Sequence, residues 1–148
     1  MNKKVLAVLV TLGIAIPAFA LSHVIWPDPP GMPAPPPGLV PFLMVPAVFE
    51  ALAFGAGVAF LVFGGRLVQR AGETPALTRA TYLAIAWSLL NWWPHVNFHR
   101  AIGFNNLVAL VEVDWAFHLT LIASAVVIAI FFIRVLSASR ERQHAVAA

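Results

Sequence analysis

The sequence contains no cysteine and little charge, and each shortage excludes a class of protein. Without cysteine there is no disulfide, no thiolate metal site and no cysteine nucleophile. Only 10% of the 148 residues are charged and 61% are hydrophobic, whereas soluble proteins carry about 25% charged residues. The basic residues are scattered and form no patch with aromatics, so no nucleic-acid partner is expected. We therefore expect an integral membrane protein surrounded by lipid.

Four apolar segments are long enough to cross a bilayer as helices. Crossing the hydrocarbon core takes roughly 20 apolar residues, because lipid offers backbone groups no hydrogen-bond partner. The segments are residues 5–26, 40–65, 80–99 and 111–133. We predict an all-α membrane protein, a single domain over residues 1–148 that forms a four-transmembrane-helix bundle.

The basic residues predict the orientation of this bundle. Only Arg100 falls on one side of the predicted membrane, and the other eight fall on the opposite side. The eight are Lys3, Lys4, Arg66, Arg70, Arg79, Arg134, Arg140 and Arg142. Because Lys and Arg concentrate in cytoplasmic loops, both termini are expected in the cytoplasm, with a cytoplasmic tail over residues 135–148. The expected location is the inner or plasma membrane of a cell, with several crossings.

The N-terminal apolar segment permits two interpretations. The basic start "MNKK", the apolar run and "AFA" at residues 18–20 are also typical of a cleavable signal peptide. Apolar residues continue to Trp26, which favours a retained helix, and removal of residues 1–20 stays open. Residues 27–39 follow as an outer loop, in which seven prolines favour extended polyproline II chain.

Ionisable residues inside the predicted helices gather at one depth. Glu50, His95 and His118 each lie 16 residues from the arginine expected at the inner end of the same helix. Those arginines are Arg66, Arg79 and Arg134. At 1.5 Å per residue, all three side chains lie about 24 Å above the inner boundary. Charged or titratable groups at such a depth point into the protein and indicate a functional site.

A second polar layer lies one helical turn farther out. His99 and Asp114 each stand four residues from the histidine of their own helix, so each pair shares one face. Ser88 and Asn91 continue the stripe inward on the third predicted helix. A polar stripe on an apolar helix faces other helices or water rather than lipid.

These residues suit a metal site. Two imidazoles and a carboxylate form a ligand set for zinc, iron or copper. Glu50, His95 and His118 are the expected ligands, with His99 and Asp114 as further ligands or as groups that orient them. A haem variant would use His118 and either His95 or His99 as axial ligands.

An alternative is a membrane-embedded pocket or acid–base enzyme for a lipid-like ligand, such as a quinone, an isoprenoid or a sterol-like compound. Glu50 and His118 would then form a proton donor–acceptor pair. The expected pocket residues are Ser88, Asn91, Trp92 and Trp115.

The same residues are also compatible with a purely structural role. Hydrogen bonds between membrane helices contribute roughly 0.6 kcal/mol each, and they would orient a small subunit against a membrane-protein partner or a second copy. Small residues at Ala51, Gly55 and Ala59 invite close helix packing within or between chains. We predict an accessory or structural membrane subunit whose polar layer can bind a metal or haem; whether it is an enzyme stays open.

Overall fold

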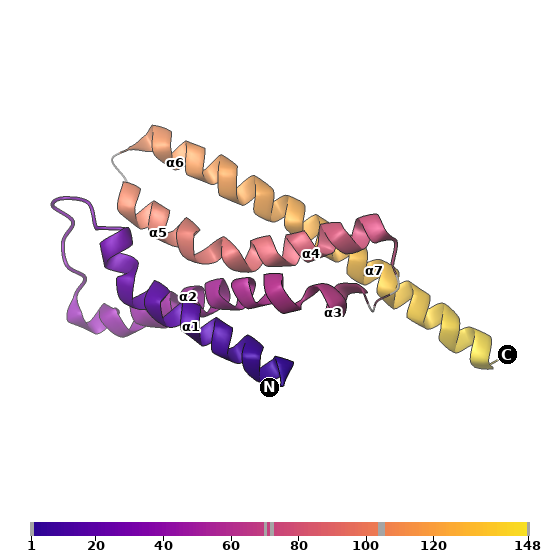
Figure 1. Cartoon of the computed structure of the whole chain (residues 1–148). Coiled ribbons are helices and arrows are strands. Elements are labelled where there is room, and N and C mark those ends of the chain that lie inside the picture. The colour runs from indigo at the N-terminus through magenta and orange to yellow at the C-terminus, as the bar shows by residue number, and fades with distance from the viewer. Residues whose placement is uncertain (1, 70, 72, 104–105, 148) are drawn as a thin grey trace.

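The computed structural model describes residues 2–69, 71, 73–103 and 106–147, with side chains up to residue 139. In these residues all regular structure is helical (Figure 1). Arg70, one of the cations used for orientation, lies outside the described residues, and so do the side chains of Arg140 and Arg142. The all-helical part of the predicted fold class is confirmed.

The helices follow one another in chain order. They are α1 (Lys3–Ile25), the short 3-10 helix η1 (Pro37–Leu39), α2 (Val40–Phe63), α3 (Gly65–Gln69), α4 (Pro75–Leu90), α5 (Trp92–Ile102), α6 (Leu107–Val113), the π-helical η2 (Asp114–Leu119) and α7 (Thr120–Ala147). The proline segment (residues 26–36) joins α1 to η1 without helix. Helix α7 continues well past the predicted boundary at residue 133, so residues 135–147 are helical.

Three helical stretches are long and apolar enough to cross a membrane, namely Lys3–Ile25, Pro37–Phe63 and Leu107–Ser139. The segment predicted at 80–99 is divided at Asn91 between α4 and α5, which follow each other along one rod (Figure 1). Pro94 lies one turn beyond the break, and it has no N–H to donate to the Leu90 carbonyl. The missing hydrogen bond explains why the helix is interrupted at this point.

The helices pack side by side in the order α1, α2, the α4–α5 rod and the α6–α7 rod. Helix α1 contacts α2, α2 contacts α4 and α5, α4 contacts α7, and α5 contacts α6. In Figure 1, α1 and α6 lie at opposite edges of this array. The predicted stripe of Ala51, Gly55 and Ala59 is buried, and a Cβ added to Gly55 would lie 2.2 Å from the Thr11 carbonyl oxygen. The small residues therefore allow α1 and α2 to approach closely.

The proline segment and the end of α5 meet at one end of the molecule, which we call the loop end. Gly103 terminates α5 with a φ of 63°, a left-handed conformation that glycine adopts without strain. A Cβ at this position would lie 3.2 Å from Pro29 Cγ, so the absence of a side chain also lets the two segments touch.

Candidate metal centre

Helix α5 presents two polar faces to different neighbours. Trp93 and Asn97 lie four residues apart and are buried, and Asn97 Oδ1 accepts a hydrogen bond of 2.7 Å from Ser22 Oγ of α1. His95 and His99 stand two residues farther along, about 200° around the helix. They face η2, where both histidines contact His118.

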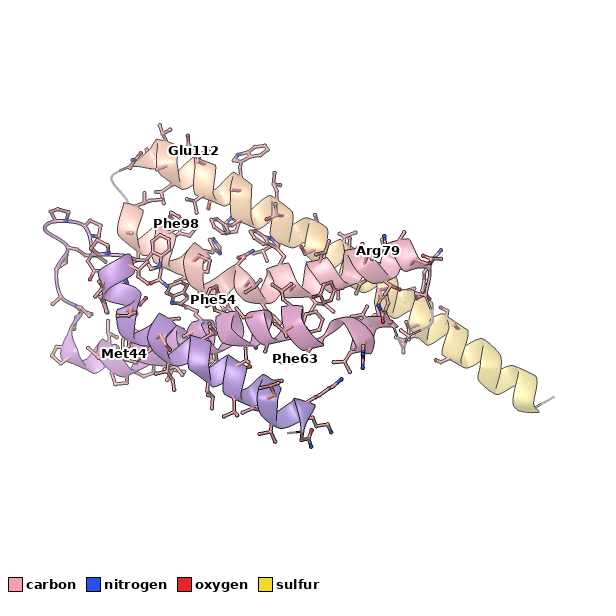
Figure 2. The ribbon with its side chains drawn as sticks, in the orientation of Figure 1. Met44, Phe54, Phe63, Arg79, Phe98 and Glu112 are labelled. Atoms are coloured by element: carbon pink, nitrogen blue, oxygen red, sulfur yellow. The ribbon has the colours of Figure 1, made fainter. Side chains whose placement is uncertain are left out.

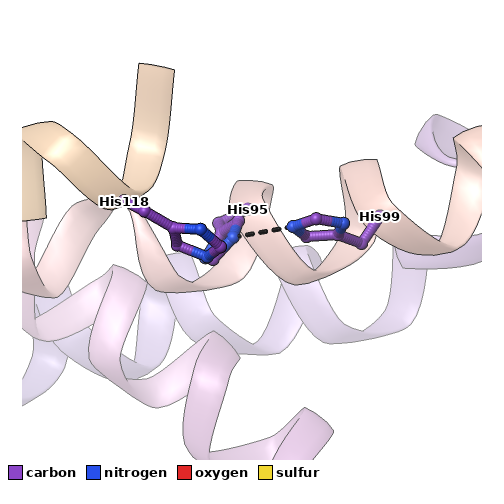
Figure 3. Close-up of side chains that lie close together, drawn as sticks. All are labelled: His95, His99 and His118. Atoms are coloured by element: carbon purple, nitrogen blue, oxygen red, sulfur yellow. Dashed lines mark hydrogen bonds between the residues drawn. The ribbon is translucent and has the colours of Figure 1, made fainter. Parts of the chain in front are cut away.

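The second face of α5 and η2 together form a cluster of three histidines and one aspartate, which we call the histidine group. One ring nitrogen from each of His95, His99 and His118 lies within 4.8 Å of the other two, and Figure 3 shows the three rings side by side. His95 Nε2 and His99 Nε2 share a hydrogen bond of 2.9 Å. Asp114 Oδ1 lies 3.5 Å from His99 Nε2 and 3.3 Å from His118 Nδ1.

The π-helical segment η2 carries two of the four members of this group. A π-helical turn contains one residue more than an α-helical turn, and such insertions often occur at functional sites. Asp114 begins η2 and His118 lies near its end. Immediately after η2, Thr120 Oγ1 accepts a hydrogen bond of 2.9 Å from Trp87 Nε1 of α4. This bond fixes the rotation of α7 against α4.

Aromatic rings cover one side of the histidine group. Phe117 stacks on His95 with ring centroids 5.2 Å apart and lies parallel to Trp87 at 6.2 Å. The other side is open, since 48% of the His118 side chain and 49% of the Asp114 side chain are exposed. A small ion can therefore reach the nitrogens without passing through the protein core.

In the described part of the chain, the ligand atoms close enough together to hold an ion belong to His95, His99 and His118. Neither Asp114 nor Glu50 belongs to this set, but Asp114 contacts two of its rings. Glu50 is on α2, only 7% exposed, and close enough to Arg100 for their charges to interact. Helix α2 packs against α5, as Figure 2 shows for Phe54, whose ring lies 5.0 Å from that of Trp93. Counting residues along a helix predicts the height of a side chain but not the direction in which it points. The face of α5 that carries Trp93 points away from the face that carries His95.

The four residues expected to line a ligand pocket lie in different surroundings. Trp92 and Trp115 are exposed, whereas Asn91 is 1% exposed and both polar atoms of its amide lack a partner in the described residues. Ser88 Oγ donates a hydrogen bond to a carbonyl oxygen of its own helix. An apolar cleft of about 440 Å³ is present, but it is lined by other residues of α2, α4 and α7.

A second polar cluster holds the proline segment against α5. Arg100 Nε lies 2.9 Å from Asp28 Oδ1, a charged contact without good hydrogen-bond alignment, and Arg100 Nη2 donates to the Trp26 carbonyl at 2.8 Å. His23 Nδ1 lies 3.6 Å from the same carboxylate. No spacing in the sequence indicated this cluster, although Arg100 is the only Lys or Arg on the predicted outer side, which also carries Asp28.

Comparisons of the chain with family models, curated proteins and solved structures gave no match. The geometry of the histidine group therefore carries the functional conclusion.

Proposed function

We propose that this chain is an integral membrane protein that binds one divalent transition-metal ion, zinc in the first instance, at the histidine group. The observation that carries the proposal is that one ring nitrogen from each of His95, His99 and His118 lies within 4.8 Å of the other two, with Asp114 in contact with His99 and His118 as the proposed fourth ligand. The contacts among these residues measure 2.9, 3.3 and 3.5 Å. A tetrahedral zinc ion with bonds of about 2.0–2.1 Å has ligand atoms about 3.3–3.4 Å apart. Ring nitrogens that lie within 4.8 Å of one another would reach this spacing after shifts of up to about 1.5 Å.

The donor set favours zinc over other cofactors. Nitrogen and carboxylate oxygen donors suit divalent zinc, copper, nickel or iron, and a tetrahedral arrangement suits zinc better than the square-planar preference of Cu²⁺. Haem fits less well, because axial imidazoles lie on opposite faces of a macrocycle. Here His95 is hydrogen-bonded to His99, and its ring centroid lies 4.7 Å from that of His118. The rings contact one another without a slot between them.

The proposed topology has four crossings with both termini in the cytoplasm. Three helical stretches have the required length and composition, and α4 with α5 supplies the remaining crossing as one interrupted rod. Lys3 and Arg66 line one cleft at the ends of α1 and α2, and the positive-inside rule puts that end in the cytoplasm. The loop end and the histidine group then face the outer side.

A filled coordination sphere supports a structural or metal-carrying role. When four protein atoms bind zinc, no position remains for the water or substrate that catalysis requires. The ion would join α5 to η2 and so fasten the α6–α7 rod to the rest of the molecule. We therefore propose an accessory membrane subunit whose edge helix is held by metal supplied from the outer side.

The apolar cleft supports a second candidate, a binding site for a lipid-like molecule. It lies beside Trp87, whose ring is parallel to that of Phe117. Phe117 in turn stacks on His95, so these two aromatic rings separate the cleft from the histidines. A molecule in the cleft would bind independently of the metal. Quenching of Trp87 fluorescence by a quinone, absent in Trp87→Phe, would test this candidate.

The metal proposal is tested on the full chain purified in detergent. After dialysis against a chelator and then zinc, we expect about one zinc per chain by elemental analysis, and an intense visible spectrum of tetrahedral Co²⁺ after cobalt substitution. Alanine at His95, His99 or His118 should abolish stoichiometric binding. His23→Ala is the matched control, because His23 lies at the loop end outside the group. Equal zinc content in the control and in His95→Ala would overturn the proposal.

A further inference from the structure

A cleft of about 410 Å³ lies at the end of the molecule opposite the histidine group. Four elements form it: the start of α1, the end of α2, α3 and α4. Its polar lining comes from Lys3, Arg66, Gln69 and Tyr82, and its apolar lining includes Leu61 and Val62. The cleft therefore combines donor groups with an apolar wall, which is the composition expected where a membrane helix bundle meets lipid headgroups.

The charges in this cleft are of one sign. Lys3 and Arg66 are cations, and no carboxylate lines the cleft or pairs with either of them in the described residues. Glu73, on the neighbouring α3–α4 connection, pairs instead with Arg134 at 3.7 Å. Two uncompensated cations and the Gln69 amide offer donors to an anion. Guanidinium and ammonium groups together bind phosphoryl oxygens well.

The wall of the cleft is held in place by a hydrogen bond between two helices. Tyr82 Oη of α4 donates to the Leu61 carbonyl of α2, and the Tyr82 ring packs on Phe60 at 5.4 Å between centroids. The hydroxyl proton of Tyr82 is therefore already used in this hydrogen bond. The side chain shapes the cleft and does not donate to an anion. Leu61 and Val62 remain exposed beside it, where acyl chains can contact them.

We propose that this cleft binds the phosphoryl headgroup of an anionic membrane lipid in the cytoplasmic leaflet, with Lys3 and Arg66 on the phosphate and the acyl chains along Leu61 and Val62. The proposal rests on the orientation given above, in which this end faces the cytoplasm, and it does not depend on the metal. Basic pockets between helices at the cytoplasmic face attract anionic lipids, whose negative surface potential favours each added cation.

Native mass spectrometry of the full chain in detergent tests this inference. The probes are phosphatidylglycerol and phosphatidylcholine with identical acyl chains, and inorganic phosphate is the competitor. We expect retention of phosphatidylglycerol over phosphatidylcholine and an affinity about tenfold or more lower in Lys3→Gln/Arg66→Gln. The matched control is Lys4→Gln/Arg79→Gln, which removes the same charge from exposed positions outside the cleft and should bind phosphatidylglycerol like the unmodified protein.

Three results would overturn the inference. If phosphatidylglycerol binding fell equally in both double variants, the lipid would be attracted by the general surface charge and not bound in the cleft. Equal retention of the two lipids would remove the role of the anionic headgroup. Displacement by an equimolar amount of inorganic phosphate would identify free phosphate, and not lipid, as the occupant. Helix content by circular dichroism and a single symmetric peak in size-exclusion chromatography report folding of each variant without reference to the metal, and zinc content is measured separately, so a folding defect and a failed metal proposal are both distinguishable from loss of lipid binding.

Discussion

At the scale of single residues, Asp114 has the most consequential position in the molecule. One of its oxygens contacts both His99 Nε2 and His118 Nδ1. In the proposed zinc site the three imidazoles would be neutral, and this oxygen would be the fourth ligand. Asp114 therefore links η2 to α5 within the histidine group.

Replacing Asp114 by asparagine should weaken zinc binding about 10–100-fold, as loss of an orienting or ligating carboxylate does in other metal sites. The amide keeps the shape but not the negative charge. Glu112→Gln is the matched control, because Glu112 is exposed two residues earlier and lies at the edge of the array (Figure 2). Competition with a chromophoric zinc chelator measures both affinities. An unchanged affinity in Asp114→Asn would remove the carboxylate from the site.

Depth along the helices predicted two of the four proposed ligands, His95 and His118, and i,i+4 spacing predicted the other two, His99 and Asp114, but depth also selected Glu50. Counting residues from a boundary arginine gives height alone. The direction of each side chain depends on how the helices are rotated, and α5 turns Trp93 and Asn97 toward α1 and α2 while His95 points to η2. The Asp28–Arg100 pair was missed because spacing within one helix cannot reveal contacts made by the proline segment.

At the scale of elements, the π-helical turn η2 decides which side chains reach α5. Deletion of Ala116 should convert η2 into ordinary α-helix and rotate Asp114 by about 100° relative to Thr120. Thr120 stays anchored to Trp87, so Asp114 turns away from His99. We expect zinc affinity to fall at least as far as in Asp114→Asn while helix content by circular dichroism is unchanged. Ala116→Leu keeps the chain length and should bind zinc normally; equal loss there would contradict this account.

The contact between α1 and α2 gives a second test at this scale. In Gly55→Ala the added methyl would lie 2.2 Å from a backbone oxygen of Thr11. Because backbone cannot move aside easily, we expect the free energy of unfolding to fall by about 1–3 kcal/mol. In Gly13→Ala nothing lies within 4 Å of the new methyl, and higher helix propensity should stabilise the protein by up to about 1 kcal/mol. Unfolding in mixed micelles measures both.

The predictability of the elements differed for physical reasons. The length of an apolar stretch can be counted in the sequence, so the stretches that form α1, α2 and α6–α7 could be recognised. The interruption at Asn91 agrees with the known effect of Pro94 on the preceding turn. The π-helical form of Asp114–Leu119 had no comparable signal, since no proline or glycine marks it. It lies between α6, which contacts α5, and α7, which contacts α4.

At the scale of the whole molecule, the helices form a row with α1 at one edge and the α6–α7 rod at the other. These two edge helices need contacts beyond those that the protein provides. Only 11% of the apolar window in Lys3–Ile25 and in Leu107–Ser139 is buried inside the protein. The protein itself therefore leaves most of both apolar helices uncovered. In the proposed arrangement a metal ion fastens the α6–α7 edge near the outer surface, and a lipid headgroup joins α1 to α3 near the inner one. The two sites would stabilise opposite ends of the same row.

The four-crossing topology can be tested directly because the chain has no cysteine of its own. Single cysteines at Met32 and Asn106 should react with a membrane-impermeant maleimide in intact cells, since both positions lie at the loop end. A cysteine at Thr74, just before α4, should react only after the membrane is opened. Thr74 and Asn106 flank α4 and α5, so labelling of both from the same side would mean that this interrupted rod does not cross. The histidine group would still form, but the orientation on which the lipid site depends would be lost.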